Sequence, residues 1–323
     1  MAKKKYSINK KKTDHWKEDI QKSVQFYNDW FLNFAPSTYI KERQEAINKV
    51  EEAFQKTECF NVLSTDILKA APKAISVLRM ATTPPLARDR LMGLAEVSKS
   101  FIKSLEEGKL PSRMDKELLD QSLNRIVAVI GKLFDTDIMP WLSEKGSPHE
   151  MDRMLATHVI ADRVCGSLAD PIIRNEQERR QLESIHDYLI QRGYRFVELK
   201  YITDFMAMEA GTFTYHLNVP AKMSRTRTVN MPIDVVIKRL NAGNGELPVL
   251  VECKSAGDFT NTNKRRKEET TKIEQLKSTY GNSVEFILFL CGYFDSSYLG
   301  YEAAEGIDWV WEHRIKDFEK AGI

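Results

Sequence analysis

Two acidic residues and a lysine on neighbouring β-rich segments could act together chemically. Asp234 lies in the segment MPIDVVIK (231–238), and Glu252 and Lys254 lie in PVLVECK (248–254). Mg²⁺ prefers oxygen ligands and is often held by one or two carboxylates together with a substrate phosphate. A lysine beside them could orient or help deprotonate an attacking water, or stabilise charge on the phosphate. This set of groups predicts metal-assisted hydrolysis of a phosphodiester.

A β-hairpin would bring the two carboxylates together. The two segments are rich in β-branched residues and flank the Gly/Asn-rich break 241–245, which is a hairpin signal. If the loop is centred on Gly243, Asp234 faces Glu252, and facing Cβ atoms in such a pair are about 5 Å apart. Two buried carboxylates this close repel each other, so the register favours a compensating divalent metal.

Strand alternation divides the predicted hairpin into two faces. The apolar face is expected to contain Ile233, Val235, Ile237, Val249, Val251 and Cys253. The other face carries Asp234, Glu252 and Lys254. Val236 and Leu250 lie beside them on the same face. A sheet with apolar residues on both faces is expected to be buried, and charged residues in a buried sheet usually have a functional role. The alternative is that this common pattern arose by chance and that the carboxylates face solvent.

The composition is that of an ordinary globular protein. The 323 residues are 42% hydrophobic and 29% charged, with a net charge of +2. This charge is too small to indicate a nucleic-acid binder, so any basic surface must be local. The four cysteines form no C-x-x-C pair, which predicts a reducing, cytoplasmic location. No apolar run is long enough to span a membrane.

The first half of the chain has helical periodicity. Helices are expected over 14–36, 37–54, 65–81, 85–105, 115–134 and 147–165. Arg88 and Arg90 follow the break Thr82-Thr83-Pro84-Pro85 and could present guanidinium groups to phosphates or guanine edges. The alternative is that they pair with Asp89 and Glu96 on a helix surface.

The second half has a mixed pattern. A helix over 175–191 is followed by strands over 194–200 and 212–219, the hairpin, a helix over 264–280, a buried strand over 284–290 and a helix over 309–318. We therefore predict a mixed α/β sheet with flanking helices, preceded by a largely helical region. The expected domains are residues 1–169, for DNA contacts or dimerisation, and residues 170–323, for catalysis.

Glu178 is an acidic residue on the apolar stripe of the helix 175–191. It lies four residues before Leu182 and seven before Ile185, so it shares their face. We predict that it approaches the metal site as a third carboxylate. The alternative is a glutamate in the first helical turn that complements the helix dipole.

Polar segments on both sides of the hairpin could contact DNA. Arg225 and Arg227 lie in a basic loop before the Asp234 strand, and Ser255 follows Lys254. Further predicted contacts are Asn261, Asn263, Lys264, Arg265, Arg266 and Lys267. Four cations at a helix start oppose the helix dipole, which favours facing phosphates. The alternative is a solvated basic turn.

Together these residues resemble the PD-(D/E)xK nuclease core. More narrowly, the chain resembles the XamI-like type II restriction endonucleases. The resemblance rests on the phrases PPLARDRL (84–91), LVECKSAGD (250–258), NTNKRRK (261–267) and DWVWEH (308–313). It covers most of the chain. One departure is that Ile233 separates Pro232 from Asp234, which are adjacent in the family pattern.

The resemblance implies Mg²⁺-dependent cleavage of double-stranded DNA at a short palindrome by a homodimer. It implies that Asp234, Glu252 and the main-chain carbonyl of Cys253 hold the metal, while Lys254 positions the attacking water. The family is similar to enzymes that read GTCGAC, and a cognate DNA methyltransferase would be the genetic partner. We expect 5′-phosphate and 3′-hydroxyl ends. Two alternatives stay open: a repair or junction-resolving nuclease, and a noncatalytic DNA-binding protein.

Overall fold

A computed structural model describes residues 7–202, 204–223, 227–243, 245–260 and 262–323, without the side chains of 262–266. The chain forms two compact units. One unit comprises Met1–Phe34 and Arg174–Ile323, and the other comprises Ala35–Ile173. The second break lies close to the predicted boundary at 169/170. The first break was not anticipated, because the N-terminal segment packs with the second half of the chain.

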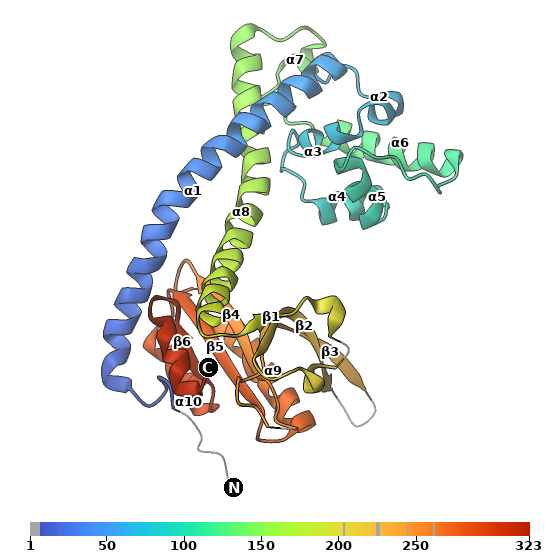
Figure 1. The fold of residues 1–323 in the computed structure, drawn as a ribbon. Helices are drawn as coiled ribbons and strands as arrows, with labels where there is room; N and C mark the ends of the chain where they lie inside the picture. The colour runs from blue at the N-terminus through green and yellow to red at the C-terminus, as the bar shows by residue number, and fades with distance from the viewer. Residues whose placement is uncertain (1–6, 203, 224–226, 244, 261) are drawn as a thin grey trace. The chain divides into compact units, whose positions relative to one another are not determined.

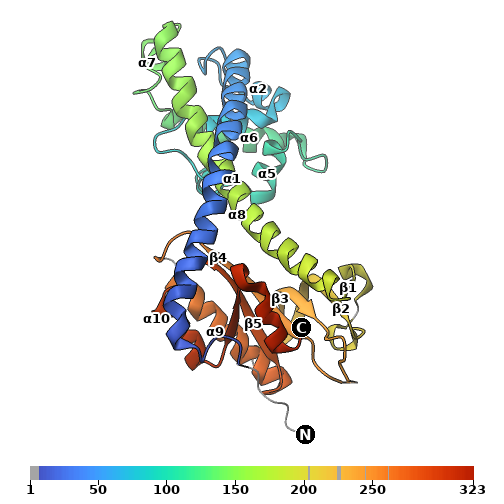
Figure 2. The ribbon, with the colours of Figure 1, turned by 60° about the vertical axis from the view of Figure 1, so that its left-hand side comes forward.

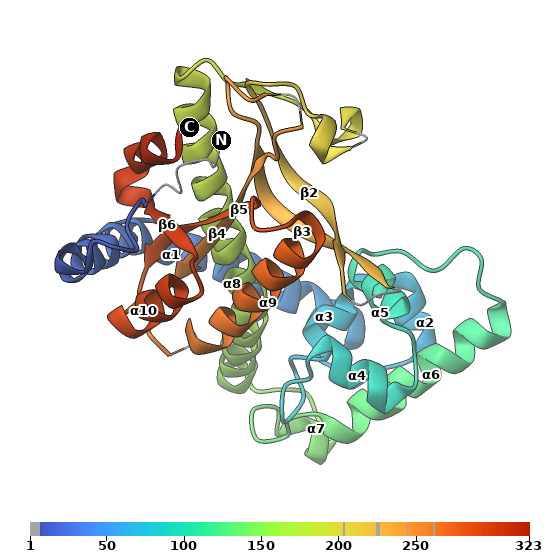
Figure 3. The ribbon, with the colours of Figure 1, turned by 90° about the horizontal axis from the view of Figure 1, so that it is seen from below.

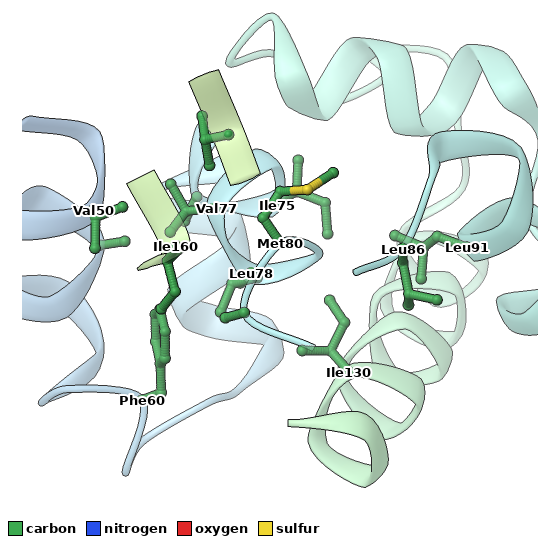
Figure 4. Packing of buried hydrophobic residues seen from close by; sticks show 14 of the residues in the cluster. Val50, Phe60, Ile75, Val77, Leu78, Met80, Leu86, Leu91, Ile130 and Ile160 are labelled. Carbon is green, nitrogen blue, oxygen red and sulfur yellow. The ribbon is translucent and has the colours of Figure 1, made fainter. Parts of the chain in front are cut away.

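The Ala35–Ile173 unit is helical. Its elements are α2 (Thr65–Ala70), η1 (Pro72–Ala74), α3 (Ile75–Leu78), α4 (Arg88–Ala95), α5 (Lys99–Glu106), α6 (Lys116–Leu133), α7 (Trp141–Glu144) and parts of α1 (Thr13–Thr57) and α8 (Glu150–Gln191). Figure 4 shows Val50, Leu78, Ile130 and Ile160, which come from four helices and belong to one buried cluster. Burial of these apolar side chains drives the packing of the unit.

Several predicted helix boundaries are wrong. The expected helix over 65–81 is divided into α2, η1 and α3, and the expected helix over 85–105 is divided into α4 and α5. A helix was expected to end near Pro36, and separate helices were expected over 147–165 and 175–191. Instead, α1 continues through Pro36 and α8 continues through Pro171. A proline removes one backbone hydrogen bond, and in helices of 45 and 42 residues the remaining bonds and the buried faces hold the backbone helical. None of the described helices is both long and apolar enough to cross a membrane.

A six-stranded mixed sheet organises the other unit (Figure 1). The strands, in spatial order, are β1 (Arg195–Phe196), β2 (Thr212–Lys222), β3 (Thr228–Ile237), β4 (Val249–Ala256), β5 (Glu285–Gly292) and β6 (Asp308–Trp311). The pairs β2/β3 and β3/β4 are antiparallel, and the other neighbouring pairs are parallel. The predicted mixed sheet is therefore confirmed.

Helices and short turns connect the strands. They are η2 (Leu199–Tyr201), η3 (Phe205–Ala207), α9 (Thr262–Tyr280) and α10 (Ser296–Ala304), and η4 (Glu312–Ala321) follows the last strand. Figure 2 shows the end of α8 leading into β1 and β2. The helix α9 is the crossover between the parallel strands β4 and β5, which need a long connection of this kind.

Both faces of the sheet are covered by helices (Figure 3). Ile273 and Leu276 of α9 pack on one face, and Ile185 and Leu189 of α8 pack on the other. The strand β5 is therefore buried along almost its whole length, as its apolar run predicts. The predicted helix over 309–318 is wrong at its start, because Trp309 lies in β6, where burial on both faces favours a strand.

The backbone at position 292, where β4 and β5 end side by side, should tolerate only glycine. Its φ is +95°, and an added Cβ would overlap the carbonyl oxygen of Ala256. We expect Gly292→Ala to lower the free energy of unfolding by about 2–3 kcal/mol. Gly243→Ala is the matched control, because nothing lies within 4 Å of a Cβ there. Urea unfolding curves measure the stability of both variants. Equal unfolding midpoints would show that position 292 does not require glycine.

Candidate active site

The strands β3 and β4 bring the two predicted carboxylates together. Val235 pairs with Val251, and continuing this register by one residue sets Asp234 opposite Glu252. The predicted hairpin register is therefore confirmed. The ladder ends here, and the Cys253 N–H donates instead to Asp234 Oδ2 at 2.7 Å. The two strands part at the point where the carboxylates stand.

The predicted faces of the hairpin hold with one exception. Cys253 packs on the apolar side that faces α8, as expected, and burial raises the pKa of its thiol well above the ordinary value. The prediction that Ile233 shares this side with Val235 is wrong, because Ile233 packs in the opposite cluster, on α9. His216 has a φ of 52° and interrupts the β2/β3 ladder opposite Asp234. Strand alternation does not continue through this distortion.

A pocket of about 330 Å³ opens where the strands part. It lies within the sheet-containing unit. The residues that line it are Arg174, Gln177, Glu178, Gln181, Asp234, Glu252, Cys253, Lys254, Ser255 and Glu268. The structure thus brings all four residues predicted to be catalytic to one pocket wall, from α8, β3 and β4.

Glu252 is almost fully buried, with 3% of its surface exposed. Its Oε1 accepts hydrogen bonds from Lys254 Nζ at 2.9 Å and from Lys272 Nζ at 2.5 Å. Within the described part of the chain, its Oε2 is buried without a hydrogen-bond partner. Leaving a carboxylate oxygen buried and unpaired is costly, so this atom is suited to bind a cation.

Asp234 carries a perturbed carboxyl group. Burial and, next, the negative charge of Glu252 raise the pKa of Asp234 to about 6. The hydrogen bond from Cys253 and the ammonium groups of Lys254 and Lys272 oppose this rise but do not cancel it. The protein therefore compensates only part of the repulsion that Asp234 experiences from Glu252.

Lys254 is held between two acidic side chains. Its Nζ lies 2.9 Å from Glu252 Oε1 and 3.7 Å from Glu269 Oε1. Burial acts to lower the pKa of Lys254, but attraction to the two carboxylates outweighs burial and the pKa is raised. Glu269 is held in turn, because Tyr298 donates its hydroxyl hydrogen to Glu269 Oε2 at 2.7 Å. A fixed, protonated ammonium can attract a phosphate and orient a water molecule.

Two of these residues, Glu269 and Lys272, were not found from the sequence. They lie on α9 with Ile273 and Leu276, at the spacing i, i+3, i+4 and i+7. This spacing describes one helix face, and two charged residues on an otherwise buried stripe were the available signal.

Gln181 is a third residue that the sequence did not indicate. Its side-chain amide donates to the backbone carbonyl of Lys254 at 3.3 Å and to that of Phe289 at 3.2 Å. Gln181 is 2% exposed. It therefore ties α8 to β4 and β5 at the level of the pocket.

Glu178 lies on the pocket wall, where its Oε1 is 3.8 Å from His216 Nε2. The alternative of a first-turn glutamate is wrong, because α8 begins at Glu150. Among the described residues, no three His, Cys, Asp or Glu side chains form a group that could hold a metal. The role of Glu178 as a third carboxylate stays a prediction.

The predicted DNA contacts fall into three sets. Arg88 and Arg90 lie in the helical unit, where Arg88 Nε donates to Glu106 Oε2 at 2.8 Å. The alternative prediction that these arginines pair with Asp89 and Glu96 is wrong, because Asp89 forms an ion pair with Lys99 and Glu96 with Arg125. Arg227 and Lys267 are exposed, and Ser255 is half-buried on the pocket wall. The side chains that lie outside the described residues are Arg225, Asn261, Asn263, Lys264, Arg265 and Arg266.

The oxygen atoms at the pocket fit a magnesium ion. Asp234 and Glu252 supply two carboxylates, and among the described residues Glu252 Oε2 has no hydrogen-bond partner, so it could bind a cation. Cys253 also lines the pocket, and its main-chain carbonyl could be a further ligand. Mg²⁺ commonly takes one or two carboxylates and completes its shell with water and substrate phosphate. The absence of a third described carboxylate ligand is compatible with this ion.

Comparisons with known proteins cover both units of the chain. The family model described as XamI restriction endonuclease matches residues 59–311. The chain is 49% identical over 315 residues to "Type II restriction enzyme SalI" from Streptomyces albus G, covering 98% of this chain and 99% of that protein. The crystal structure of protein VC1899 from Vibrio cholerae aligns with a TM-score of 0.27 and 14% identity, over 79% of this chain and 55% of that one. A score this low carries no argument.

Asp234→Asn removes a charge that burial penalises and can keep the hydrogen bond from Cys253. The pKa of about 6 in the folded protein lies above the ordinary 3.8, so wild-type stability falls relative to the variant as the pH rises between these values. In metal-free buffer at pH 8 we expect the variant to be more stable by on the order of 2 kcal/mol.

The advantage of Asp234→Asn should shrink to well under about 1 kcal/mol at pH 4, because the aspartic acid is then protonated in the folded protein and, with its ordinary pKa of 3.8, about half protonated in the unfolded chain. Urea unfolding at the two pH values measures it. The exposed Asp137 supplies the control variant, Asp137→Asn, for which we expect no such pH-dependent gain. A less stable Asp234→Asn protein at pH 8 would show that the carboxylate pair is not under strain.

Proposed function

The chain belongs to the XamI restriction endonuclease family and is a type II restriction enzyme, and from this premise we propose that it hydrolyses both strands of duplex DNA at a short palindrome, using the pocket at Asp234, Glu252 and Lys254. One observation carries the proposal. A buried carboxylate pair with an unpaired oxygen, Glu252 Oε2, stands beside a fixed ammonium in a pocket. This arrangement is suited to a cation and a phosphate together.

We propose Mg²⁺ as the cofactor, held by Asp234, Glu252 and the main-chain carbonyl of Cys253. When bound, Mg²⁺ stabilises negative charge that develops on the phosphate and lowers the pKa of water. The residues of the chain position the reactants. Lys254 holds the attacking water in line with the phosphorus, and the bond from phosphorus to the 3′ oxygen breaks. The products would carry 5′-phosphate and 3′-hydroxyl ends.

The supporting residues keep this geometry in place. Lys272 shares Glu252 Oε1 with Lys254, so Oε2 is left for the metal. Glu269 holds the far side of the Lys254 ammonium, and Gln181 fixes the Lys254 backbone. Glu178 is proposed to approach from α8 as an outer carboxylate.

The partners follow from the same proposal. A palindrome presents two equivalent half-sites, so a homodimer with a matching two-fold axis is the expected form. The first sequence to test is GTCGAC, and a cognate DNA methyltransferase would protect the host genome. We place the enzyme in the cytoplasm, where DNA is available and where its four unpaired cysteines stay reduced.

Digestion of plasmid DNA tests the function. With Mg²⁺ we expect discrete fragments whose sequenced ends define one palindrome, and with a chelator we expect no cutting. Nicking that depends on branched structure would instead indicate a junction-resolving or repair nuclease. Binding without any cleavage would indicate a noncatalytic DNA-binding protein.

Alanine substitution of Asp234, Glu252 or Lys254 should reduce the cleavage rate by on the order of 10³-fold or more, because each removes a group that acts on the reacting phosphate. Binding of DNA without Mg²⁺ should be largely retained. The exposed Lys316 gives the control variant, Lys316→Ala. Near-normal cutting by one of the three site variants, with an unchanged melting temperature, would remove that residue from the mechanism.

Glu269→Gln keeps the shape of the side chain but removes one of the two charges that hold the Lys254 ammonium. We expect the cleavage rate to fall by about 10- to 100-fold, as is common for groups that orient a catalytic residue. Glu274→Gln, on the exposed side of the same helix, should cut at the wild-type rate. Equal rates for both variants would show that Glu269 has no part in positioning Lys254.

A further inference from the structure

The strands β2 and β3 continue as a two-stranded ribbon beyond the part of the sheet that includes β4. The pairing with β4 ends at Val235, whereas β2 and β3 stay paired from Leu217 opposite Ile233 to Lys222 opposite Thr228. Figure 3 shows the two long strands side by side. The ribbon starts at the level of Asp234, on the same strand.

One side of this ribbon is anchored to α9. Its buried residues are Leu217, Val219, Ala221, Met231 and Ile233. The backbone is tied to the end of the same helix, because Thr279 Oγ1 accepts a hydrogen bond from Lys222 N at 2.7 Å and Tyr280 donates its hydroxyl hydrogen to the Pro220 carbonyl. An isolated two-stranded ribbon is marginally stable, so these contacts make it rigid.

The other side of the ribbon is exposed and carries hydrogen-bonding side chains. These are His216, Asn218, Lys222, Thr228 and Asn230, which we call the ribbon row. The remaining exposed positions between them are Pro220 and Pro232. None of these seven described positions carries a carboxylate, so the surface does not repel a polyanion.

The ribbon row is continuous with the catalytic pocket. His216 Nε2 lies 3.8 Å from Oε1 of Glu178, a residue of the pocket wall. Asn230 lies four residues before Asp234 on β3, which corresponds to about 13 Å along a strand. Base pairs are stacked about 3.4 Å apart, so this length spans three to four steps. That is the extent of a half-site in a short palindrome.

We propose that the ribbon row enters the major groove of duplex DNA and reads base edges next to the cut phosphate. The major groove is wide enough for a two-stranded ribbon, and each base pair presents a distinct pattern of donors and acceptors there. Asparagine amides match the adenine edge, and a lysine matches the guanine edge. The inference rests on the proposed function and assigns its sequence specificity to Asn218 and Asn230 first.

The test compares the full-length wild-type protein with the double variant Asn218→Ala/Asn230→Ala. The matched control is Asn282→Ala, an exposed asparagine at the far end of β5 from the pocket. Two duplexes of 24 base pairs serve as probes, one centred on the wild-type cut site and one with that site scrambled. Binding is measured with Ca²⁺ in place of Mg²⁺, and melting temperatures confirm folding.

We expect the double variant to bind the site duplex about 10- to 100-fold more weakly than the wild type, as for lost base contacts. Its binding to the scrambled duplex should stay within about twofold, and Asn282→Ala should match the wild type on both probes. If the ratio of the affinities for the two duplexes is the same in the variant as in the wild type, the proposal is overturned. In particular, equal weakening on both duplexes would place the ribbon on the DNA backbone.

Methylation of guanine N7 by dimethyl sulfate gives a second measurement, since this atom lies in the major groove. The wild type should protect guanines of the site, and the double variant at the same protein concentration should protect them less, because it binds the site more weakly. Protection only of adenine N3, in the minor groove, would overturn the inference. A wild type that favours neither duplex and gives no discrete fragments would instead refute the proposed function, before any ribbon variant is interpreted.

Discussion

The repulsion between Asp234 and Glu252 is the constraint on which the rest of the site depends. Two carboxylates on adjoining strands, one of them 3% exposed, are costly unless charge compensates them. The protein compensates them in part, with Lys254 and Lys272 both on Glu252 Oε1. What remains is an unpaired oxygen and a pKa of Asp234 raised to about 6, which is the environment a divalent cation would complete.

The helix α9 links this constraint to the fold. Its buried stripe packs on the sheet through Ile273 and Leu276, and the same face places Glu269 beside Lys254 and Lys272 beside Glu252. Because the helix is the crossover between β4 and β5, its position follows from the parallel pairing of those strands. The end of α9 also anchors the β2/β3 ribbon. One packed helix therefore couples the electrostatics of the pocket to the geometry of the surface beside it.

Local patterns predicted the parts of the structure that depend on neighbouring residues. The hairpin register followed from loop symmetry about Gly243, and Val235 does pair with Val251. The helix over 115–134 was also expected, and α6 spans Lys116–Leu133 with Asp115 as its cap. Predictions failed where distant packing decides. The helix α1 passes through Pro36, Trp309 lies in a strand, and Ile233 changes face beside the distorted His216.

The amino-acid order alone determined that two carboxylates and a lysine would meet on a hairpin, because strand alternation and turn symmetry are properties of the local chain. It also carried the family phrases that a match over residues 59–311 bears out. Only the tertiary structure decided which cations stand beside Glu252 and which residues hold Lys254. Glu269 and Lys272 come to Lys254 and Glu252 from α9, and Gln181 comes to the Lys254 backbone from α8; side chains of separate elements become neighbours only when the core packs.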